Sequence, residues 1–351
     1  MGRRLRWISI AIVVVFGVVC AVFYEVFFGP NVFAGAEEKS FFVSKGQTFA
    51  SVVDSLEVQG IIGSRRSFVF VAKFLGGTSR LKVAKYKFRS GISNYGLLTA
   101  LLEGKDIALI PVTLREGLTS RQQAHVLAQT IGIDSARFVS LVHDPSIVQS
   151  FGITSPSLEG YLFPETYDFR WQADEQDIIT HLVGHFQAFY NDSLQARARD
   201  IGWTTNQVMT LASIVEGEAV LPDERPIIAG VYYNRLRKGM KLEADPTIRF
   251  TIEDGPRRIL YSDLDVDNPY NTYRNKGLPP GPINNPGKAS ILAALFPTHH
   301  DYLFFVANGR GGHWFSSTFA EHKRNVRKYR RERRLREAHS LTGSSGRQNY
   351  H

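Results

Sequence analysis

Cysteine is nearly absent from this chain of 351 residues: Cys20 is its one thiol, so an intramolecular disulfide is excluded. The ten histidines show no metal-ligand spacing such as H-E-x-x-H, and we expect neither a resident metal nor a cofactor. A hydrophobic content of 43%, with 12% aromatic residues, excludes a disordered composition. The length allows an anchor plus one or two globular domains, whose cores need no disulfide.

The body of the chain has no excess of positive or negative charge, although the formal net charge of the whole chain is +9. Residues 323–338 hold nine Lys or Arg against two Glu, and three arginines precede residue 7. The rest of the chain is close to neutral. A nucleic-acid-binding domain needs a basic face on its folded part, so the sequence argues against nucleic acid as a partner. We interpret 323–338 as a charged terminal helix.

The one long apolar run lies at the N-terminus. Residues 7–24, WISIAIVVVFGVVCAVFY, are uncharged and long enough to span a hydrocarbon core of about 30 Å as a helix. Arg3, Arg4 and Arg6 precede the run, and Glu25 follows it. The positive-inside rule then predicts a cytoplasmic N-terminus (1–6), a single-pass anchor (7–28) in the cytoplasmic (inner) membrane, and an extracytoplasmic or periplasmic remainder.

Two alternatives to a retained anchor exist. A cleaved signal peptide would use the small residues 34–36, but a cleavable apolar region is usually about 7–15 residues, and this run is longer. A buried core helix is disfavoured because the run has no polar face. The sequence therefore favours a retained anchor.

Residues 40–109 have the pattern of a small α/β module. Short strands are expected at 41–43 and 83–88, and helices at 48–56, 68–75 and 97–102, with Thr48 as a helix cap. The strand, turn and helix around Val43 to Thr48 resemble a LysM-like module, a class that binds the GlcNAc-containing glycan of cell walls. A spacer domain without a glycan site of its own is the alternative, and the sequence leaves it open.

We place a domain boundary near residue 110, where a strand at 110–114 precedes a helix that starts at Thr119 with a capping-box-like pattern. The second domain is expected to run from 110 to 338. The polar segment 339–351 is expected to be a disordered tail.

Two loop segments of the second domain suit a binding cleft. SLEGYLFPETY (157–167) places two carboxylates among aromatic residues, which can stack on sugar rings and bind their hydroxyls, although an ordinary loop packed on the core fits equally well. Between 268 and 287, a high density of Pro and Gly predicts a rigid loop of the kind that shapes clefts.

The helix predicted at 206–219 carries the most suggestive carboxylates. At 100° per residue its apolar residues form one stripe, and Glu216 and Glu218 flank that stripe on opposite sides. A carboxylic acid at such a border is expected to have a raised pKa, which a general acid for glycosidic cleavage needs near neutral pH. A surface or capping role is the alternative for each carboxylate.

Several motifs together resemble the YceG-like family of endolytic murein transglycosylases. They are LREG (114–117), SLEGYLFPETY (157–167), LASIVEGE (211–218), YNRLRKGMKLEADPT (233–247), NPYNTYRNKGLPPGPINNPG (268–287) and YLFFVANGRGGHWFSSTFAEH (302–322). The resemblance covers nearly the whole chain and implies that Glu216 is catalytic. Gly217, Glu243, Ala244 and Arg115 depart from the usual residues, and the change at 243–244 falls where it can alter a glycan subsite.

The resemblance implies an α+β chain with a single N-terminal transmembrane helix, a small LysM-like α/β module and a mixed α/β catalytic domain. The implied reaction cleaves the MurNAc–GlcNAc β-1,4 bond without water and leaves 1,6-anhydro-MurNAc ends. One carboxyl group serves as acid and then as base, which agrees with one carboxylate per side of the helix. Our candidates for binding the sugar or orienting the acid are Glu218, Asn234, Asp245, Asn271 and Tyr273. Each of them has a structural hydrogen-bonding role as its alternative.

Two further functions remain open from the sequence. A hydrolytic muramidase would use the same site with water, and only the product distinguishes it. A non-catalytic scaffold would bind glycan through residues 40–109, although it should lack the glutamate at 216. The expected partners are peptidoglycan glycan strands and, from the resemblance, the peptidoglycan synthases beside which nascent strands are terminated.

Overall fold

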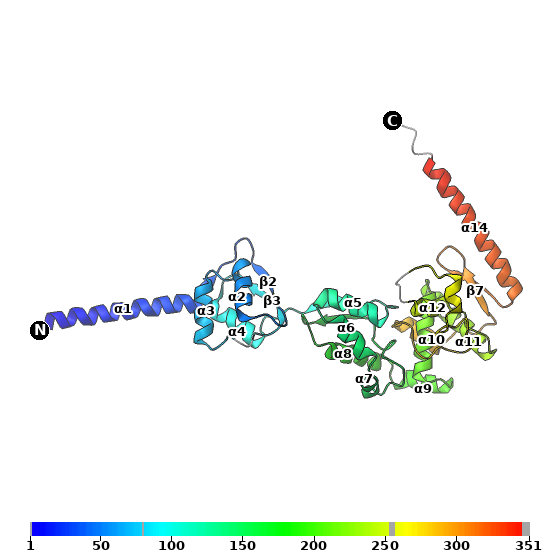
Figure 1. The fold of residues 1–351 in the computed structure, drawn as a ribbon, viewed down its shortest axis with the longest axis horizontal. Helices are drawn as coiled ribbons and strands as arrows, with labels where there is room; N and C mark the ends of the chain where they lie inside the picture. Colours follow the sequence, from blue (N-terminus) through cyan, green and yellow to red (C-terminus); the bar gives the residue numbers. More distant parts are fainter. Residues whose placement is uncertain (1, 79–80, 253–256, 346–351) are drawn as a thin grey trace. The chain divides into compact units, whose positions relative to one another are not determined.

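The computed structural model describes residues 2–78, 81–252 and 257–345, which form two compact units (Figure 1). The first unit comprises residues 1–112, 129–133 and 167–174, and the remainder of the chain belongs to the second. The predicted α+β chain that begins with an apolar helix is confirmed.

Helix α1 (Gly2–Phe28) opens the first unit. Its segment Leu5–Phe28 has a mean hydropathy of 2.7 and is long and apolar enough to cross a membrane. The last turn of α1 is embedded in the unit: the Phe27 ring belongs to the hydrophobic core, and Asn94 Nδ2 donates to the Val26 carbonyl at 2.9 Å. Helix α1 is therefore joined to the unit without a linker.

After α1 the chain forms two strands, two helices, two more strands and a final helix. They are β1 (Pro30–Asn31), β2 (Glu38–Val43), α2 (Phe49–Val58), α3 (Arg65–Phe74), β3 (Ala84–Arg89), β4 (Ile92–Ser93) and α4 (Asn94–Glu103). Strands β2 and β3 pair antiparallel, and so do β1 and β4. Helices α2, α3 and α4 each begin at a capping hydroxyl, because the side chains of Thr48, Ser64 and Ser93 accept hydrogen bonds from backbone N–H groups.

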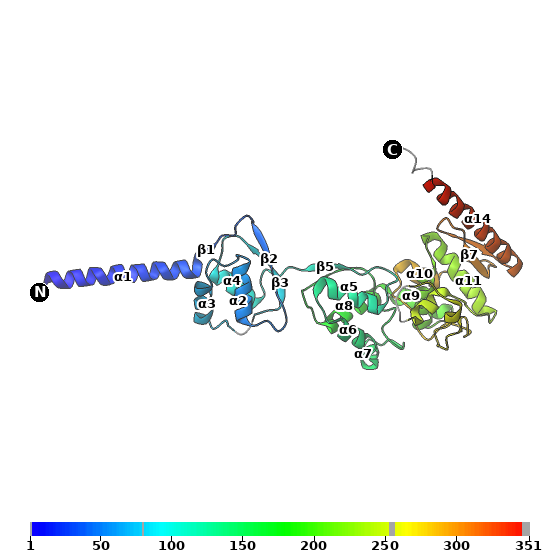
Figure 2. The same cartoon turned by 45° about the horizontal axis from the view of Figure 1, so that its top comes forward.

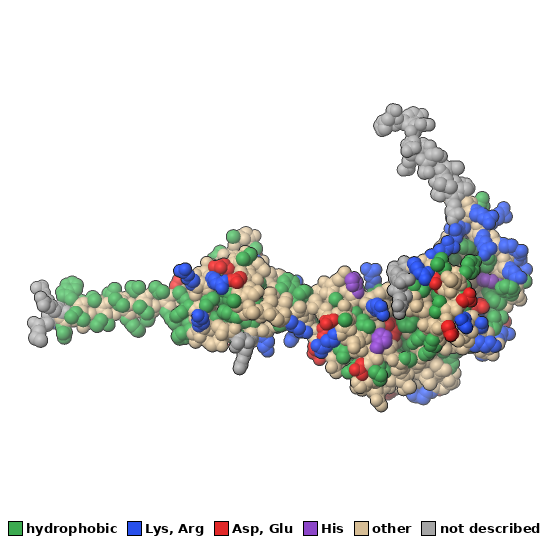
Figure 3. All heavy atoms as spheres, viewed as in Figure 1, with side chains coloured by type: hydrophobic (Ala, Val, Ile, Leu, Met, Phe, Trp, Pro, Cys, Tyr) green, Lys and Arg blue, Asp and Glu red, His purple; other side chains and the backbone are tan. Residues whose placement is uncertain are grey.

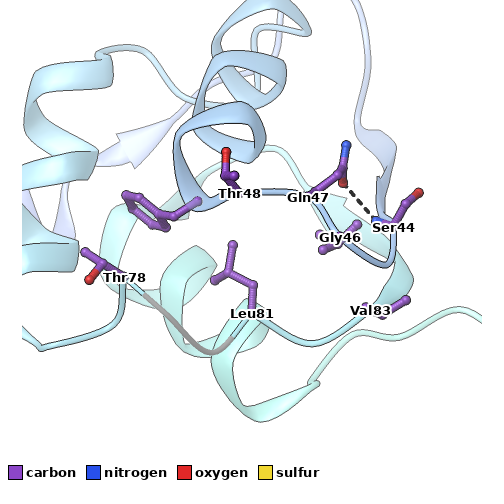
Figure 4. Close-up of a pocket in the computed structure, with 9 residues that line it drawn as sticks. Ser44, Gly46, Gln47, Thr48, Thr78, Leu81 and Val83 are labelled. Carbon is purple, nitrogen blue, oxygen red and sulfur yellow. Dashed lines mark hydrogen bonds between the residues drawn. The ribbon is translucent and has the colours of Figure 1, made fainter.

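A cavity of about 340 Å³ opens in the first unit between the loop from β2 to α2 and the segment that leads into β3. Figure 4 shows Ser44, Gly46, Gln47 and Thr48 on one side of it and Leu81 among the residues on the other. Gln47 Oε1 accepts a hydrogen bond from the Ser44 amide at 2.8 Å, which fixes the loop.

Residues 167–174 return to the first unit from later in the chain. The Trp171 ring contacts Phe42 edge to face with centroids 4.9 Å apart, and its Nε1 donates to Ser44 Oγ at 3.3 Å. The boundary predicted near residue 110 took no account of this return, because no local signal marks it.

The second unit is mainly helical. In chain order it contains α5 (Ser120–Ile131, whose last residues belong to the first unit), α6 (Ser135–Val142), α7 (Pro145–Ser150), α8 (Glu175–Phe189), α9 (Asp192–Asp200), α10 (Thr205–Glu218), α11 (Arg225–Arg237), α12 (Asp245–Thr251), α13 (Lys288–Leu295) and α14 (Phe319–Ser345). Two short 3-10 helices, η1 (Pro222–Glu224) and η2 (Tyr261–Asp265), lie between them. In this unit β7 (Phe304–Ala307) pairs antiparallel with β8 (His313–Ser316). Strand β5 (Ile110–Thr113) pairs with β6 (Thr166–Phe169), and all residues of these two strands except Thr113 and Thr166 belong to the first unit. Helices α10, α11 and α13 pack on one another and form the core of this unit. Figure 2 shows α10 and α11 next to each other.

Helix α14 carries the basic segment recognised in the sequence, and its Lys and Arg side chains gather along it in Figure 3. Lys328 Nζ lies 4.3 Å from the centre of the Trp314 ring, which ties the helix to β8. Helix α14 continues to Ser345, past residue 339, where we predicted a disordered tail. The rest of that predicted tail, 346–351, lies outside the described residues.

Candidate active site

Helix α10 positions the candidate acid. It begins at a capping box, in which the Thr204 side chain accepts from the Gln207 amide and the Gln207 side chain accepts from the Thr204 amide. Every residue from Val208 to Val215 is buried, so the helix is fixed along its length before it reaches Glu216. The predicted helix is therefore present, but it is buried on all sides from Val208 to Val215 rather than along one stripe.

The Glu216 carboxylate is held by two donors from other elements. Arg225 Nη2, at the start of α11, donates to Oε1 at 3.2 Å. The Gly287 amide, at the start of α13, donates to Oε2 at 3.1 Å. The Glu216 side chain is 6% exposed. A carboxylate held in this way by a guanidinium and an amide at a helix N-terminus is fixed in one orientation.

The loops around this carboxylate are joined through Asn285, which is fully buried. Its Oδ1 accepts from the amides of Gly160 and Leu162, at 2.9 and 3.0 Å. Its Nδ2 donates to the Leu118 carbonyl and to Glu159 Oε1, both at 3.0 Å. One side chain thus connects two of the motif segments recognised in the sequence with the residue that follows the LREG motif.

The two carboxylates of the 157–167 segment have different surroundings. Glu159 is buried and accepts from the Ser120 amide and hydroxyl, and burial raises its pKa. It holds loops together rather than lining a cleft. Glu165 is partly exposed and pairs with Lys288 Nζ at 2.5 Å.

Glu116 is a second carboxylate beside Glu216 that sequence reasoning did not identify. Its Oε2 lies 4.0 Å from Arg225 Nη2, the same nitrogen that donates to Glu216. A Cβ placed on Gly287 would overlap the Glu116 carboxylate, so glycine is required for this approach. Burial, and then the charge of Glu216, raise the pKa of Glu116. The one sequence signal was its position in the LREG motif.

Glu218 faces a different cluster, as the flanking geometry predicted. Tyr232 Oη donates to Glu218 Oε1 at 3.1 Å, and Tyr273 Oη donates to Asp245 Oδ1 at 2.6 Å. Burial, followed by the charge of Asp245, raises the pKa of Glu218 from 4.5 to about 7.

The two remaining predicted binding residues, Asn234 and Asn271, bond to backbone groups of neighbouring loops. Asn234 Nδ2 donates to the carbonyls of His300 and Tyr302, at 2.7 and 3.1 Å. Asn271 is fully buried, donates to two carbonyls of the 264–266 segment, and accepts from the Tyr273 amide at 2.9 Å. Asn271 therefore orients Tyr273, and a role in sugar binding stays a prediction for all five candidates.

Gly217 separates the two carboxylate environments. A Cβ at this position would lie 2.7 Å from Pro246 Cβ, so the start of α12 packs directly on the backbone of α10. This contact is a structural reason for glycine where related sequences often carry a charged residue. Among the described residues, no group of three His, Cys, Asp or Glu side chains lies close enough to hold a metal ion.

Comparisons with known proteins agree with the motifs. Residues 41–328 match the model of the YceG-like family. An endolytic murein transglycosylase of Bacillus subtilis (strain 168) is 30% identical over 302 residues, covering 82% of this chain and 83% of the relative. Another, from Streptococcus pneumoniae (strain ATCC BAA-255 / R6), is 28% identical over 318 residues, and the match spans 81% of this chain but 57% of that longer protein.

A solved structure extends the similarity to the fold. The crystal structure of a yceG-like protein from Listeria monocytogenes is 31% identical and superposes with a TM-score of 0.59. The match covers 82% of this chain and 98% of that one.

Proposed function

This chain belongs to the YceG-like family, and on that premise we propose that it is an endolytic lytic transglycosylase of peptidoglycan in which Glu216 is the catalytic acid. The observation that carries the residue assignment is the Glu216 carboxylate itself. It is nearly buried, oriented by Arg225 and the Gly287 amide, and surrounded by the segments that carry the family motifs.

The proposed reaction needs one carboxyl group and no water. The Glu216 carboxyl protonates the bridging oxygen of the MurNAc–GlcNAc β-1,4 bond, and the bond from C1 to that oxygen breaks. The C6 hydroxyl of MurNAc then attacks C1 and returns its proton to the carboxylate. The product is a 1,6-anhydro-MurNAc end, and the acid is regenerated. Arg225 and the Gly287 amide stabilise the carboxylate between the two proton transfers.

For the sugar we propose the Glu218 cluster as a contact surface. Asp245 and Tyr273 are linked by their hydrogen bond, and Asp245 lies close enough to affect the pKa of Glu218. Carboxylates and a phenol grouped in this way can bind hydroxyl groups of a glycan. Asn234 and Asn271 then act by positioning backbone around that surface.

A hydrolytic muramidase is the second candidate, and Glu116 favours it. Hydrolysis with a water nucleophile uses two carboxyl groups. Glu116 and Glu216 both lie within 4.0 Å of one arginine nitrogen, so Glu116 supplies a second carboxyl group beside the proposed acid. We prefer the transglycosylase because the relatives that match this chain carry that name.

We also propose that residues 40–109 bind glycan as a LysM-like module. The cavity between the loop at residues 44–49 and the segment before β3 offers hydroxyl, amide and apolar groups, which suit a sugar. A module of this kind would hold a strand near the catalytic unit. The non-catalytic scaffold is the weaker alternative, because the chain retains Glu216.

The proposed location is a cytoplasmic membrane, with the N-terminus inside and both units outside. Helix α1 is long and apolar enough for the span. Retention is supported by packing, because Phe27 and Phe33 are buried in the core of the first unit and cleavage after Ala36 would remove both. Protease added to spheroplasts should therefore degrade the second unit, and protection of that unit would contradict this orientation.

On this side of the membrane we propose that the enzyme terminates nascent strands beside peptidoglycan synthases.

Product analysis tests the proposed function. Purified peptidoglycan digested by the chain should give 1,6-anhydro-MurNAc ends in mass spectra, with cuts inside strands as well as at their termini. The Glu216→Gln variant is the matched control. Reducing MurNAc ends alone would establish the muramidase instead.

A further inference from the structure

Helix α3 has apolar side chains on both of its faces. Phe68, Val71 and Ala72 are buried in the core of the first unit. On the other side, Phe70 and Phe74 are 51% and 64% exposed. Single exposed apolar residues are common in soluble proteins, but a helix that is apolar on two faces usually has a second apolar surface to contact.

These exposed rings lie directly beside the end of α1. The centroid of the Phe74 ring is 5.7 Å from that of Phe23 and 5.3 Å from that of Phe27. On α4, Tyr95 is 41% exposed, and its ring lies 5.5 Å from Phe28. Figures 1 and 2 both show α3 against the end of α1. We call Phe28, Phe70, Phe74 and Tyr95 the aromatic collar.

The depth of the collar in a membrane follows from the length of α1. At about 1.5 Å per residue, the helix from Trp7 to Phe27 rises about 30 Å, which equals the thickness of a typical hydrocarbon core. Phe27 then lies at the outer boundary of that core. Because Phe27 is packed into the unit without a linker, the collar lies at the same level.

The chemistry of the collar suits the headgroup region. Aromatic residues concentrate where the hydrocarbon core meets water. Lys73 and Arg66 are exposed on the same helix and can reach anionic headgroups while their stems stay in the apolar layer.

We propose that the aromatic collar is a membrane-docking surface that seats the first unit directly on the outer face of a phospholipid bilayer. The unit is then held at the membrane by two contacts, α1 in the core and the collar at the boundary. This inference rests on the proposed anchoring by α1 and is independent of the assignment of Glu216. A glycan bound by the first unit would be held close to the membrane surface.

Fluorescence quenching in protein-free phospholipid vesicles tests the inference with the full chain. The natural Cys20, labelled with an environment-sensitive dye, reports whether α1 is inserted. In a Cys20→Ser background, Phe74→Cys and Tyr95→Cys place the dye in the collar. Lys45→Cys places it just after the C-terminal end of β2, which is the matched control. The start of β2 lies beside β1, since Glu38 pairs with Arg89 and the Gly91 amide donates to the Asn31 carbonyl, and β1 directly follows α1. Lys45 therefore lies at the end of the β2–β3 pair away from α1.

Lipids that carry a nitroxide partway along an acyl chain should quench the dye at position 20, because Cys20 lies about 10 Å below the boundary at Phe27. Lipids that carry a nitroxide near the headgroup should quench dyes at positions 74 and 95, and neither lipid should quench the dye at position 45. Quenching at 20 without quenching at 74 and 95 would overturn the docking surface while the anchor stands. Absence of quenching at 20 would overturn the anchor and the docking surface together, without bearing on catalysis. If the dye at position 74 is shielded from water in native membranes but not in protein-free vesicles, a membrane protein rather than lipid covers the collar, and the proposed lipid contact is wrong.

Discussion

Glu116 and Glu216 share one arginine: Arg225 Nη2 lies 3.2 Å from Glu216 Oε1 and 4.0 Å from Glu116 Oε2. One positive charge therefore lies between two carboxylates that come from distant parts of the sequence. Glu165 and Lys288, paired with each other, are the further charged groups that act on Glu116. The raised pKa of Glu116 therefore depends on burial and on charges that the fold brings together.

The first prediction concerns Glu116→Gln. Burial and the charge of Glu216 raise the pKa of Glu116, so this carboxyl gains its charge over a pH range above the usual one. Below that range neither chain carries a charge at position 116, and the two chains should have the same kcat. As the pH rises through that range, the charged Glu116 of the unaltered chain acts on the Arg225 nitrogen that also holds Glu216, so the two profiles of kcat should diverge.

Glu332→Gln on α14 is the control for this comparison, because it removes a carboxylate outside the cluster. Its profile should coincide with that of the unaltered chain. A Glu116→Gln profile that is merely lower at every pH would mean that Glu116 has a structural role alone.

The second prediction uses the raised pKa of Glu218. Its value in the folded chain is about 7 against 4.5 when unperturbed, so between these pH values the folded state keeps a proton that the unfolded state has lost. Stability conferred by this group is therefore greatest below about pH 4.5 and decreases as the pH rises through 7. Gln at 218 keeps an acceptor for Tyr232 without the charge. The thermal midpoint of Glu218→Gln, relative to the unaltered chain, should rise by a few degrees between pH 5 and pH 8. An equal difference at both pH values would show that the carboxyl is not protonated in the fold.

The third prediction concerns Asn285→Ala. The substitution leaves the buried amides of Gly160 and Leu162 without their acceptor, at a cost of about 1–3 kcal/mol each. We expect a lower thermal midpoint and a loss of activity, although Asn285 does not touch Glu216. Unchanged stability, measured by calorimetry, would contradict the role given to this side chain.

The helices and motif loops of the second unit could be predicted from the sequence because their signals are local. The spacing of the apolar residues predicts the helix at 206–219, within one residue of α10 at each end, and the Pro and Gly residues of 277–287 mark the loop that packs on it. The side of α10 on which each carboxylate lies also follows from helical periodicity alone.

The charges around those carboxylates could not be predicted in the same way. Glu116 reaches Arg225 because the loop at 114–118 is bonded to residue 285, a contact between segments far apart in the sequence. The raised pKa of Glu218 depends on Asp245 from α12 and on burial. The sequence predicts that Phe27 ends the membrane anchor and that Phe33 lies between the anchor and the first module. The fold instead buries both rings in the core of the first unit.

The fourth prediction follows from that packing. A chain that begins at residue 37 lacks Phe27 and Phe33, and removal of one buried phenylalanine side chain typically costs about 3–5 kcal/mol. Hydrogen exchange of the amides in 38–103 should be far faster in this chain than in one that begins at residue 25. The second unit, which carries none of these contacts, should exchange at the same rate in both. Equal protection of 38–103 in the two chains would remove the packing argument for a retained anchor.

The most direct test of the central claim is the turnover of Glu216→Gln beside that of Glu218→Gln, measured on peptidoglycan with thermal midpoints recorded for both. Gln keeps the shape of Glu, but its one amide oxygen can accept from Arg225 or from the Gly287 amide and not from both, and it cannot deliver a proton. Loss of general acid catalysis is worth about 10²–10⁴ in rate, so Glu216→Gln should lose at least that much while remaining folded. Glu218→Gln should lose less, because its partners are Tyr232 and the Asp245 cluster. A folded Glu216→Gln variant that keeps more than about a tenth of the activity, or inactivity confined to Glu218→Gln, would contradict the assignment.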